Sequence, residues 1–245
     1  MRRTITLFTA RILLSVFAVL FVTGCDAAST FSETQQQLYT LLEQENLPPE
    51  SRYTIINRLA NNLLAAKEYN QLIIFLTSYV EDNPGDTYNA YWLLMTAYVY
   101  MQLEAKPMAE YYFDKIINTC QDLETQGQSI HFLCLQNLIQ ISQNSSHRIN
   151  YFTEIIERFP QLVNITELHY RLAVEYENEG EWDLALKSYS DFLAQEDAST
   201  IQITGEPNAY TNAQRLVDFN DSPKDWTFES LEALEKAVKQ AITNY

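Results

Sequence analysis

The feature that most constrains the fold is an apolar pattern that recurs four times at nearly constant steps. In each copy, one apolar or aromatic residue is followed three and four positions later by two more; these first residues are Leu76, Phe113, Phe152 and Tyr189. The steps between them are 37, 39 and 37 residues. The spacing inside each copy places its side chains on one face of a helix. A fixed step of this length indicates stacked helical units, with a generic helical bundle as the alternative.

The segment from His169 to Leu193 indicates that each unit holds two helices. Apolar residues on both sides of Gly180 follow helical spacing, and glycine suits the turn between them because it adopts positive φ without strain. Two helices approach closely where one of them offers a small residue. We therefore expect Ala173 and Ala185 at the helix contact, with Trp182 filling core space around them.

This order of small and aromatic positions resembles the tetratricopeptide repeat (TPR), a motif of 34 residues. The matching residues of the fourth copy are Leu172, Ala173, Tyr176, Gly180, Trp182, Ala185, Tyr189 and Phe192. The resemblance implies an all-α, TPR-like right-handed superhelical solenoid of about four helix-turn-helix repeats. These repeats cover about 53–86, 90–123, 129–162 and 166–199. In the third repeat, Gln136 and Arg148 occupy positions that the family fills with small residues.

The segments on either side of the repeats are predicted to flank the stack. Residues 25–52 hold an anchor linker and a lead-in helix over 32–46. Residues 200–245 form a C-terminal extension, in which 209–219 is expected to add a short helix. Residues 226–242 have a continuous apolar face and are predicted to form a capping helix, because the last repeat of a solenoid exposes its hydrophobic side.

Residues 1–24 read as a lipoprotein signal peptide. Arg2 and Arg3 form a basic start, and an apolar run over 12–22 follows that is too short to span a bilayer comfortably. The run ends in the letters VTGC, which resemble the lipobox of bacterial lipoproteins; an ordinary signal peptide with an incidental cysteine is the alternative. The resemblance implies that Cys25 carries a lipid anchor in the cell membrane and that the mature chain faces the periplasm. Whether it resides at the inner or the outer membrane stays open.

The charge of the chain argues against nucleic acid as a partner. The sequence has 16 Lys and Arg against 32 Asp and Glu, a formal net charge of −16. Removal of residues 1–24 takes away three arginines and no acids, so the mature chain has a net charge of −19. Such a chain repels phosphate backbones and anionic lipids. The lipid, rather than charge, would therefore hold the protein at the membrane.

The sequence shows no recognisable catalytic or metal-binding motif. It contains no Gly-rich phosphate loop and no G-x-S-x-G or H-E-x-x-H pattern. His131 and Cys134 are three positions apart and Cys120 could lie near, but a fourth metal ligand is not evident. We therefore expect no catalytic residues, no metal and no cofactor. In an exported protein Cys120 and Cys134 can form a disulfide, or they remain buried free thiols.

The expected functional surface is the concave groove that the TPR resemblance implies, lined by the first helix of each repeat. Tyrosine rings offer contact area there and amides can bond a peptide backbone. Filling of the groove by the flanking helices is the alternative. The predicted partner-binding residues are Asn57, Asn61, Tyr91, Leu94, Tyr98, Met101, Asn137, Gln140, Tyr170 and Glu177.

Together these features predict a membrane-anchored, exported TPR lipoprotein that acts as a scaffold for protein–protein interactions in a bacterial cell envelope. Outer-membrane assembly and periplasmic transport systems are examples of such settings. A carrier that binds an apolar small molecule in the groove is the second hypothesis. An enzyme with an unrecognised site is the third.

Overall fold

The computed structural model describes residues 28–44, 47–221, 236 and 239–240. The signal peptide, Cys25 and most of the predicted capping helix lie outside these residues. Within them the protein is mostly helical, so the all-α prediction is confirmed. A two-stranded antiparallel hairpin of β1 (Glu124–Thr125) and β2 (Gln128–Ser129) interrupts the helices.

The helices follow one another largely as hairpins. The described helices are α2 (Ala28–Leu42), α3 (Pro49–Ala65), α4 (Tyr69–Asp82), α5 (Asn89–Gln102), α6 (Lys106–Thr119), α7 (Ile130–Ile141), α8 (Ser145–Arg158), the 3-10 turn η1 (Pro160–Leu162), α9 (Ile165–Glu179), α10 (Trp182–Leu193) and α11 (Ala209–Asp221). The pairs α3/α4, α5/α6, α7/α8 and α9/α10 coincide with the four predicted repeats. Helix α11 lies where the short helix was expected, and α2 begins four residues before the predicted lead-in helix.

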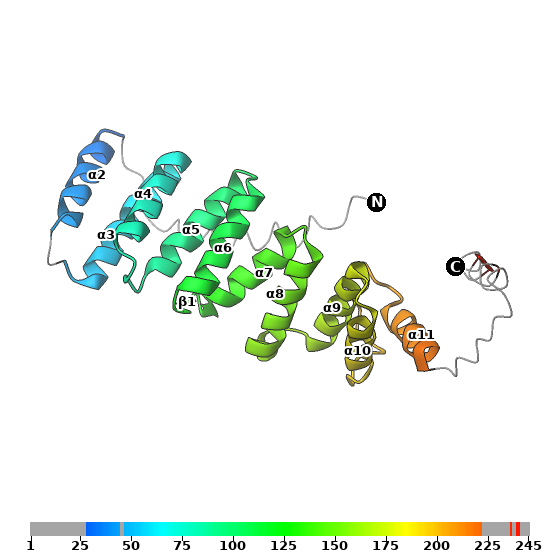
Figure 1. The fold of residues 1–245 in the computed structure, drawn as a ribbon. Helices are drawn as coiled ribbons and strands as arrows, with labels where there is room; N and C mark the ends of the chain where they lie inside the picture. Colours follow the sequence, from blue (N-terminus) through cyan, green and yellow to red (C-terminus); the bar gives the residue numbers. More distant parts are fainter. Residues whose placement is uncertain (1–27, 45–46, 222–235, 237–238, 241–245) are drawn as a thin grey trace.

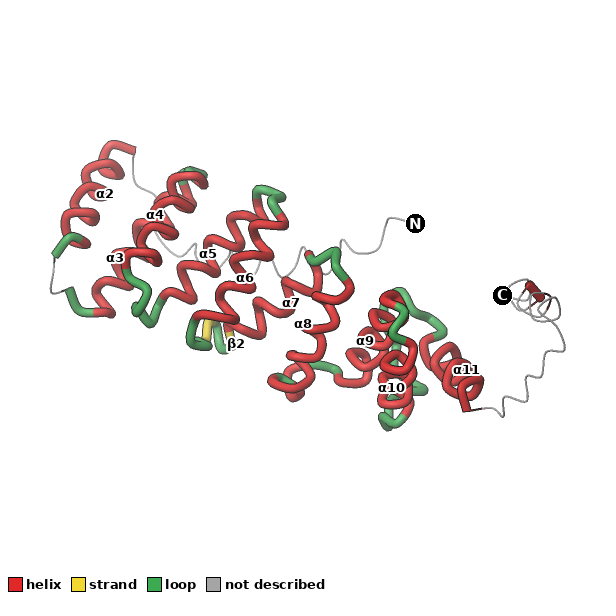
Figure 2. The backbone as a smooth tube through the Cα atoms, in the orientation of Figure 1, coloured by secondary structure: helices red, strands yellow, loops and turns green. Residues whose placement is uncertain are grey.

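The helices stand in chain order along one direction (Figure 1, Figure 2). Each helix from α3 to α10 packs against the one before it and the one after it, and α5 also touches α7. Helices α2 and α11 lie at opposite ends of the row (Figure 1). The described part is therefore an open row of hairpins, whereas TPR membership and superhelical handedness stay predictions.

Local sequence signals explain where several helices begin and end. The side chains of Ser129, Asn144 and Asn164 each accept a backbone N–H in the first turn of α7, α8 and α9, which satisfies a donor that the helix leaves free. Gly180 ends α9 in the left-handed conformation with φ of 76°. The predicted turn between α9 and α10 is thus present at this glycine.

Several alanines are buried where the helices pack together. Ala60, Ala97, Ala109 and Ala173 are fully buried, and Ala185 nearly so. A buried alanine leaves no room for a longer side chain unless neighbouring helices move apart. This packing agrees with the role that the sequence assigns to Ala173 and Ala185.

Replacement of Ala173 by leucine is expected to lower the free energy of unfolding by roughly 1–3 kcal/mol, because the added methylene groups overpack the α9–α10 contact. Chemical denaturation measures the change. Ala194→Leu is the matched control, since Ala194 is exposed at the end of α10 and its substitution should stay within about 0.5 kcal/mol. Equal losses in both variants would contradict this assignment.

Most of the buried apolar side chains form two clusters along the row. The larger cluster runs from Ile56 on α3 to Phe159 after α8, and the smaller from Tyr170 on α9 to Ala213 on α11. An ion pair between Arg148 on α8 and Glu175 on α9 lies at the junction between them. The α8–α9 junction therefore combines apolar contacts with a charged, partly buried pair.

The structure corrects the prediction that Trp182 fills the core. Its side chain is 54% exposed, whereas Ala185, Tyr189 and Phe192 supply the buried face of α10. Helical side chains point toward the N-terminus of their helix. As the first residue of α10, Trp182 therefore directs its ring beyond the end of the hairpin, where no earlier turn covers it.

Candidate functional site

Four of the predicted groove residues are buried inside the protein. Leu94, Tyr98, Asn137 and Tyr170 are 6%, 5%, 8% and 3% exposed. On this side α5 touches α7 directly, and Asn137 Nδ2 donates to the Tyr98 hydroxyl oxygen at 3.2 Å. Burial raises the pKa of Tyr98 to about 12, so the phenol stays neutral. The prediction that these four residues line an open groove is wrong, because large side chains on neighbouring helices fill that space.

The other predicted residues reach the surface to differing degrees. Asn57, Asn61, Tyr91, Met101 and Glu177 are half-buried, and Gln140 is exposed. Asn61 Nδ2 donates to Asn57 Oδ1 at 3.2 Å, and Glu177 Oε2 accepts the Tyr189 hydroxyl at 2.8 Å. The accessible part of the predicted surface therefore lies mainly on α3 and α5.

Three half-buried tyrosines meet beside these residues and are called the tyrosine cluster: Tyr53 on α3, Tyr88 before α5 and Tyr91 on α5. The Tyr53 ring centroid lies 4.8 Å from that of Tyr88, 5.7 Å from that of Tyr91 and 5.2 Å from that of the buried Trp92. The Tyr91 hydroxyl donates to the Glu124 carbonyl oxygen of β1 at 2.5 Å. Burial raises the pKa of Tyr53 and Tyr91, so both phenols stay neutral.

Tyr53 and Tyr88 are not among the surface residues predicted from the sequence. The run YNAYW at the start of α5 was a partial signal, because its three aromatic residues at i, i+3 and i+4 share one helix face. This spacing predicts an aromatic contact there but not how far neighbouring helices cover it. Pairing with Tyr53 depends on how α3 packs against the start of α5. That contact is set by tertiary structure and is not visible in the local pattern.

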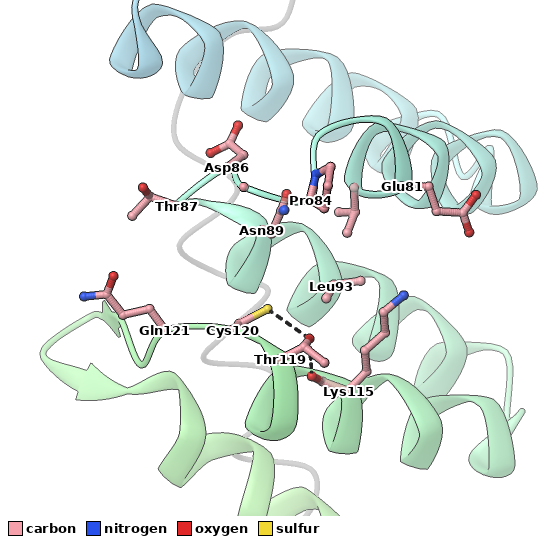
Figure 3. A pocket seen from close by; sticks show the side chains of 12 residues that line it. Glu81, Pro84, Asp86, Thr87, Asn89, Leu93, Lys115, Thr119, Cys120 and Gln121 are labelled. Atoms are coloured by element: carbon pink, nitrogen blue, oxygen red, sulfur yellow. Dashed lines mark hydrogen bonds between the residues drawn. The ribbon is translucent and has the colours of Figure 1, made fainter.

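A separate pocket, called the α4–α6 pocket, lies between the end of α4, the start of α5 and the end of α6 (Figure 3). Its volume is about 430 Å³. The pocket is lined by Val80, Glu81, Pro84, Gly85, Asp86, Thr87, Asn89, Leu93, Lys115, Thr119, Cys120 and Gln121.

One wall of the α4–α6 pocket holds a buried amide with an unused acceptor. Asn89 is 5% exposed, and its Nδ2 donates to the Asn83 carbonyl oxygen at 2.8 Å. Its Oδ1 has no hydrogen-bond partner in the part of the chain that the structure describes. On the opposite wall the Cys120 thiol lies 3.8 Å from the Thr119 hydroxyl, and burial raises its pKa. The thiol therefore stays protonated at neutral pH and is a weak nucleophile.

His131 is held in a fully bonded network. Arg158 donates to Nδ1 at 2.7 Å, Nε2 lies 3.1 Å from the Cys120 carbonyl oxygen, and the backbone N–H donates to Asp122 Oδ1. The arginine and carbonyl partners place the ring proton on Nε2. Burial lowers the pKa of His131, so the ring is neutral and structural in this setting.

The described residues offer no assembled metal site, since no three His, Cys, Asp or Glu side chains are grouped to hold an ion there. Cys120 and Cys134 are both free thiols, which resolves the open alternative in favour of unpaired cysteines in this structure. None of the described helices has the length and apolar character to cross a membrane.

A comparison with models of known protein families finds no match to this chain. A comparison with curated proteins likewise finds no similar sequence. Functional inference therefore depends on the residues and their arrangement.

Proposed function

We propose that the protein is a lipid-anchored scaffold that binds another protein on the exported side of a bacterial membrane, in envelope assembly or periplasmic transport. The observation that carries this proposal is the half-buried tyrosine cluster on an open row of helices, in which Tyr53 shares helix α3 with Asn57 and Asn61. In the described part of the chain, the helices stand one after another in a row (Figure 1).

The chemistry of this surface suits an extended protein segment. Tyrosine rings supply rigid contact area at low entropic cost, and asparagine amides can donate to and accept from a peptide backbone. The hydrogen bond from Tyr91 to Glu124 holds one ring in place before any partner arrives. The net charge of −19 that remains after removal of residues 1–24 favours partners with a basic surface, because opposite charge accelerates encounter.

The burial of Leu94 and Tyr98 gives no support to the alternative of a carrier for an apolar small molecule. The side chains that would line its binding groove pack against neighbouring helices instead.

Partner binding is testable by site-specific photocrosslinking in the native membrane. A crosslinking residue at position 57 is expected to give one discrete protein adduct, and Tyr88→Ala should lower its yield about tenfold through loss of an aromatic anchor. The control is a crosslinker at position 187, an exposed site on α10. Equal adducts at both positions, or a yield unchanged by Tyr88→Ala, would refute the assignment of this surface.

The lipid anchor is testable separately. Cys25→Ala is expected to move the protein from the membrane fraction to the soluble fraction, because the acyl chains that hold it there are absent. Cys120→Ala serves as the control and should remain in the membrane fraction. Retention of the Cys25→Ala protein in the membrane would show that something other than a lipid on Cys25 anchors it.

A further inference from the structure

We propose that the α4–α6 pocket binds a small zwitterion, with its ammonium group at the Asn89 side and its carboxylate at Lys115. Free amino acids and short peptides with unmodified ends share this chemistry. The inference is independent of the proposed scaffold function, because the tyrosine cluster forms no part of the pocket lining.

The Asn89 side of the pocket is rich in hydrogen-bond acceptors. Because Asn89 Nδ2 is committed to Asn83, its Oδ1 is left without a partner and is shielded from solvent. A ligand N–H would satisfy this acceptor if the Asn89 side chain turns toward the pocket that it lines. Asp86 and Thr87 line the pocket on the same side, in the segment that leads into α5 (Figure 3). The Asp86 carboxylate accepts the Tyr88 backbone N–H at 2.8 Å and the Tyr79 hydroxyl. Its oxygens have further lone pairs, so it can also accept from an ammonium group.

The opposite side of the pocket supplies a cation. Lys115 rises from α6 across the pocket from Asp86 and Thr87 (Figure 3). It is half-buried, and no ion pair joins it to a carboxylate among the described residues. A partly buried ammonium without a counter-ion favours an incoming carboxylate.

The remaining lining fixes the size and character of the ligand. Val80, Pro84 and Leu93 give an apolar surface between the two polar sides, which suits methylene or methyl groups. A volume of about 430 Å³ accommodates an amino acid or a dipeptide. Glu81 and Asp86 against Lys115 leave the lining with more negative than positive charge, so a simple anion is disfavoured. The protonated Cys120 thiol makes binding non-covalent.

The test is isothermal titration of the full mature protein in detergent with four probes: L-leucine, L-alanyl-L-alanine, its N-acetyl form and its C-terminal amide. At least one probe with both ends free is expected to bind with a Kd of about 1 mM or tighter. Each blocking group should raise the Kd of the dipeptide at least about tenfold. Leucine and the dipeptide distinguish a free amino acid from a peptide as the source. Failure of both free-ended probes to bind, or equal affinity of all dipeptide forms, would overturn the proposal.

Lys115→Met locates the carboxylate end, because it keeps the side-chain length and removes the charge. This variant is expected to bind the free-ended dipeptide about tenfold more weakly and to bind the C-terminal amide with unchanged affinity. Lys106→Met, on the exposed first turn of the same helix, is the matched control and should bind like the unmodified protein. Equal weakening of the acid and the amide, or full binding by Lys115→Met, would contradict the assigned orientation.

Discussion

Replacement of Trp92 by alanine is expected to lower the free energy of unfolding by about 3–5 kcal/mol. Trp92 is 1% exposed and is among the largest fully buried side chains of α5. Its ring packs against Tyr53, so its loss would leave a cavity between α3 and α5. Urea denaturation followed by circular dichroism measures the change.

Trp182→Ala is the matched control for this experiment, since it removes the same side chain from an exposed site. Because Trp182 is 54% exposed, the decrease in the free energy of unfolding should stay within about 1 kcal/mol. A larger loss at Trp182 than at Trp92 would mean that the α9–α10 hairpin buries the ring, as the repeat pattern alone predicts. The packing of both hairpins described above would then be wrong.

Arg148→Met is expected to destabilise the protein by about 2–3 kcal/mol, because it leaves the Glu175 carboxylate partly buried without its partner. Arg148 Nε donates to Glu175 Oε1 at 2.8 Å and its Nη2 donates to Oε2 at 2.6 Å. Its Nη1 also donates to the Ser142 carbonyl oxygen at 2.9 Å. The guanidinium thus ties α9 to the loop before α8. Thermal unfolding of the variant gives the change.

The double variant Arg148→Met with Glu175→Leu separates two explanations of that loss. If the unpaired carboxylate causes it, the double variant should regain most of the stability, since two apolar residues replace the pair. If the double variant is as unstable as Arg148→Met, the hydrogen bonds to Ser142 and Ser145 are the main contribution. A single variant as stable as the original protein would show that the ion pair does not hold the junction.

Local sequence patterns were sufficient to predict the helices from α3 to α10 and their pairing. Helical periodicity is a property of neighbouring residues, so the faces that contain Phe113 and Tyr189 can be found without a structure. The turn at Gly180 was predictable for the same reason, because a left-handed residue between two apolar faces favours glycine. The buried position of Ala173 followed from its place between larger residues.

The burial of the predicted groove residues could not be obtained in this way. Tyr98 and Asn137 are 39 positions apart, and their contact depends on the distance and angle between α5 and α7. A repeat pattern indicates which side of a helix a residue occupies but not how closely the next repeat covers it. The α4–α6 pocket could not be predicted from the sequence for a similar reason. Asn89 and Lys115 line one pocket only because α4, α5 and α6 pack together.

The open row of helices is the claim on which the proposed binding surface depends, and small-angle X-ray scattering tests it most directly. A soluble form covering residues 26–221 should give a skewed pair-distance distribution and a radius of gyration well above the roughly 16 Å of a compact chain of that length. A symmetric distribution with a radius near 16 Å would contradict the open row, and with it the surface proposed for a partner.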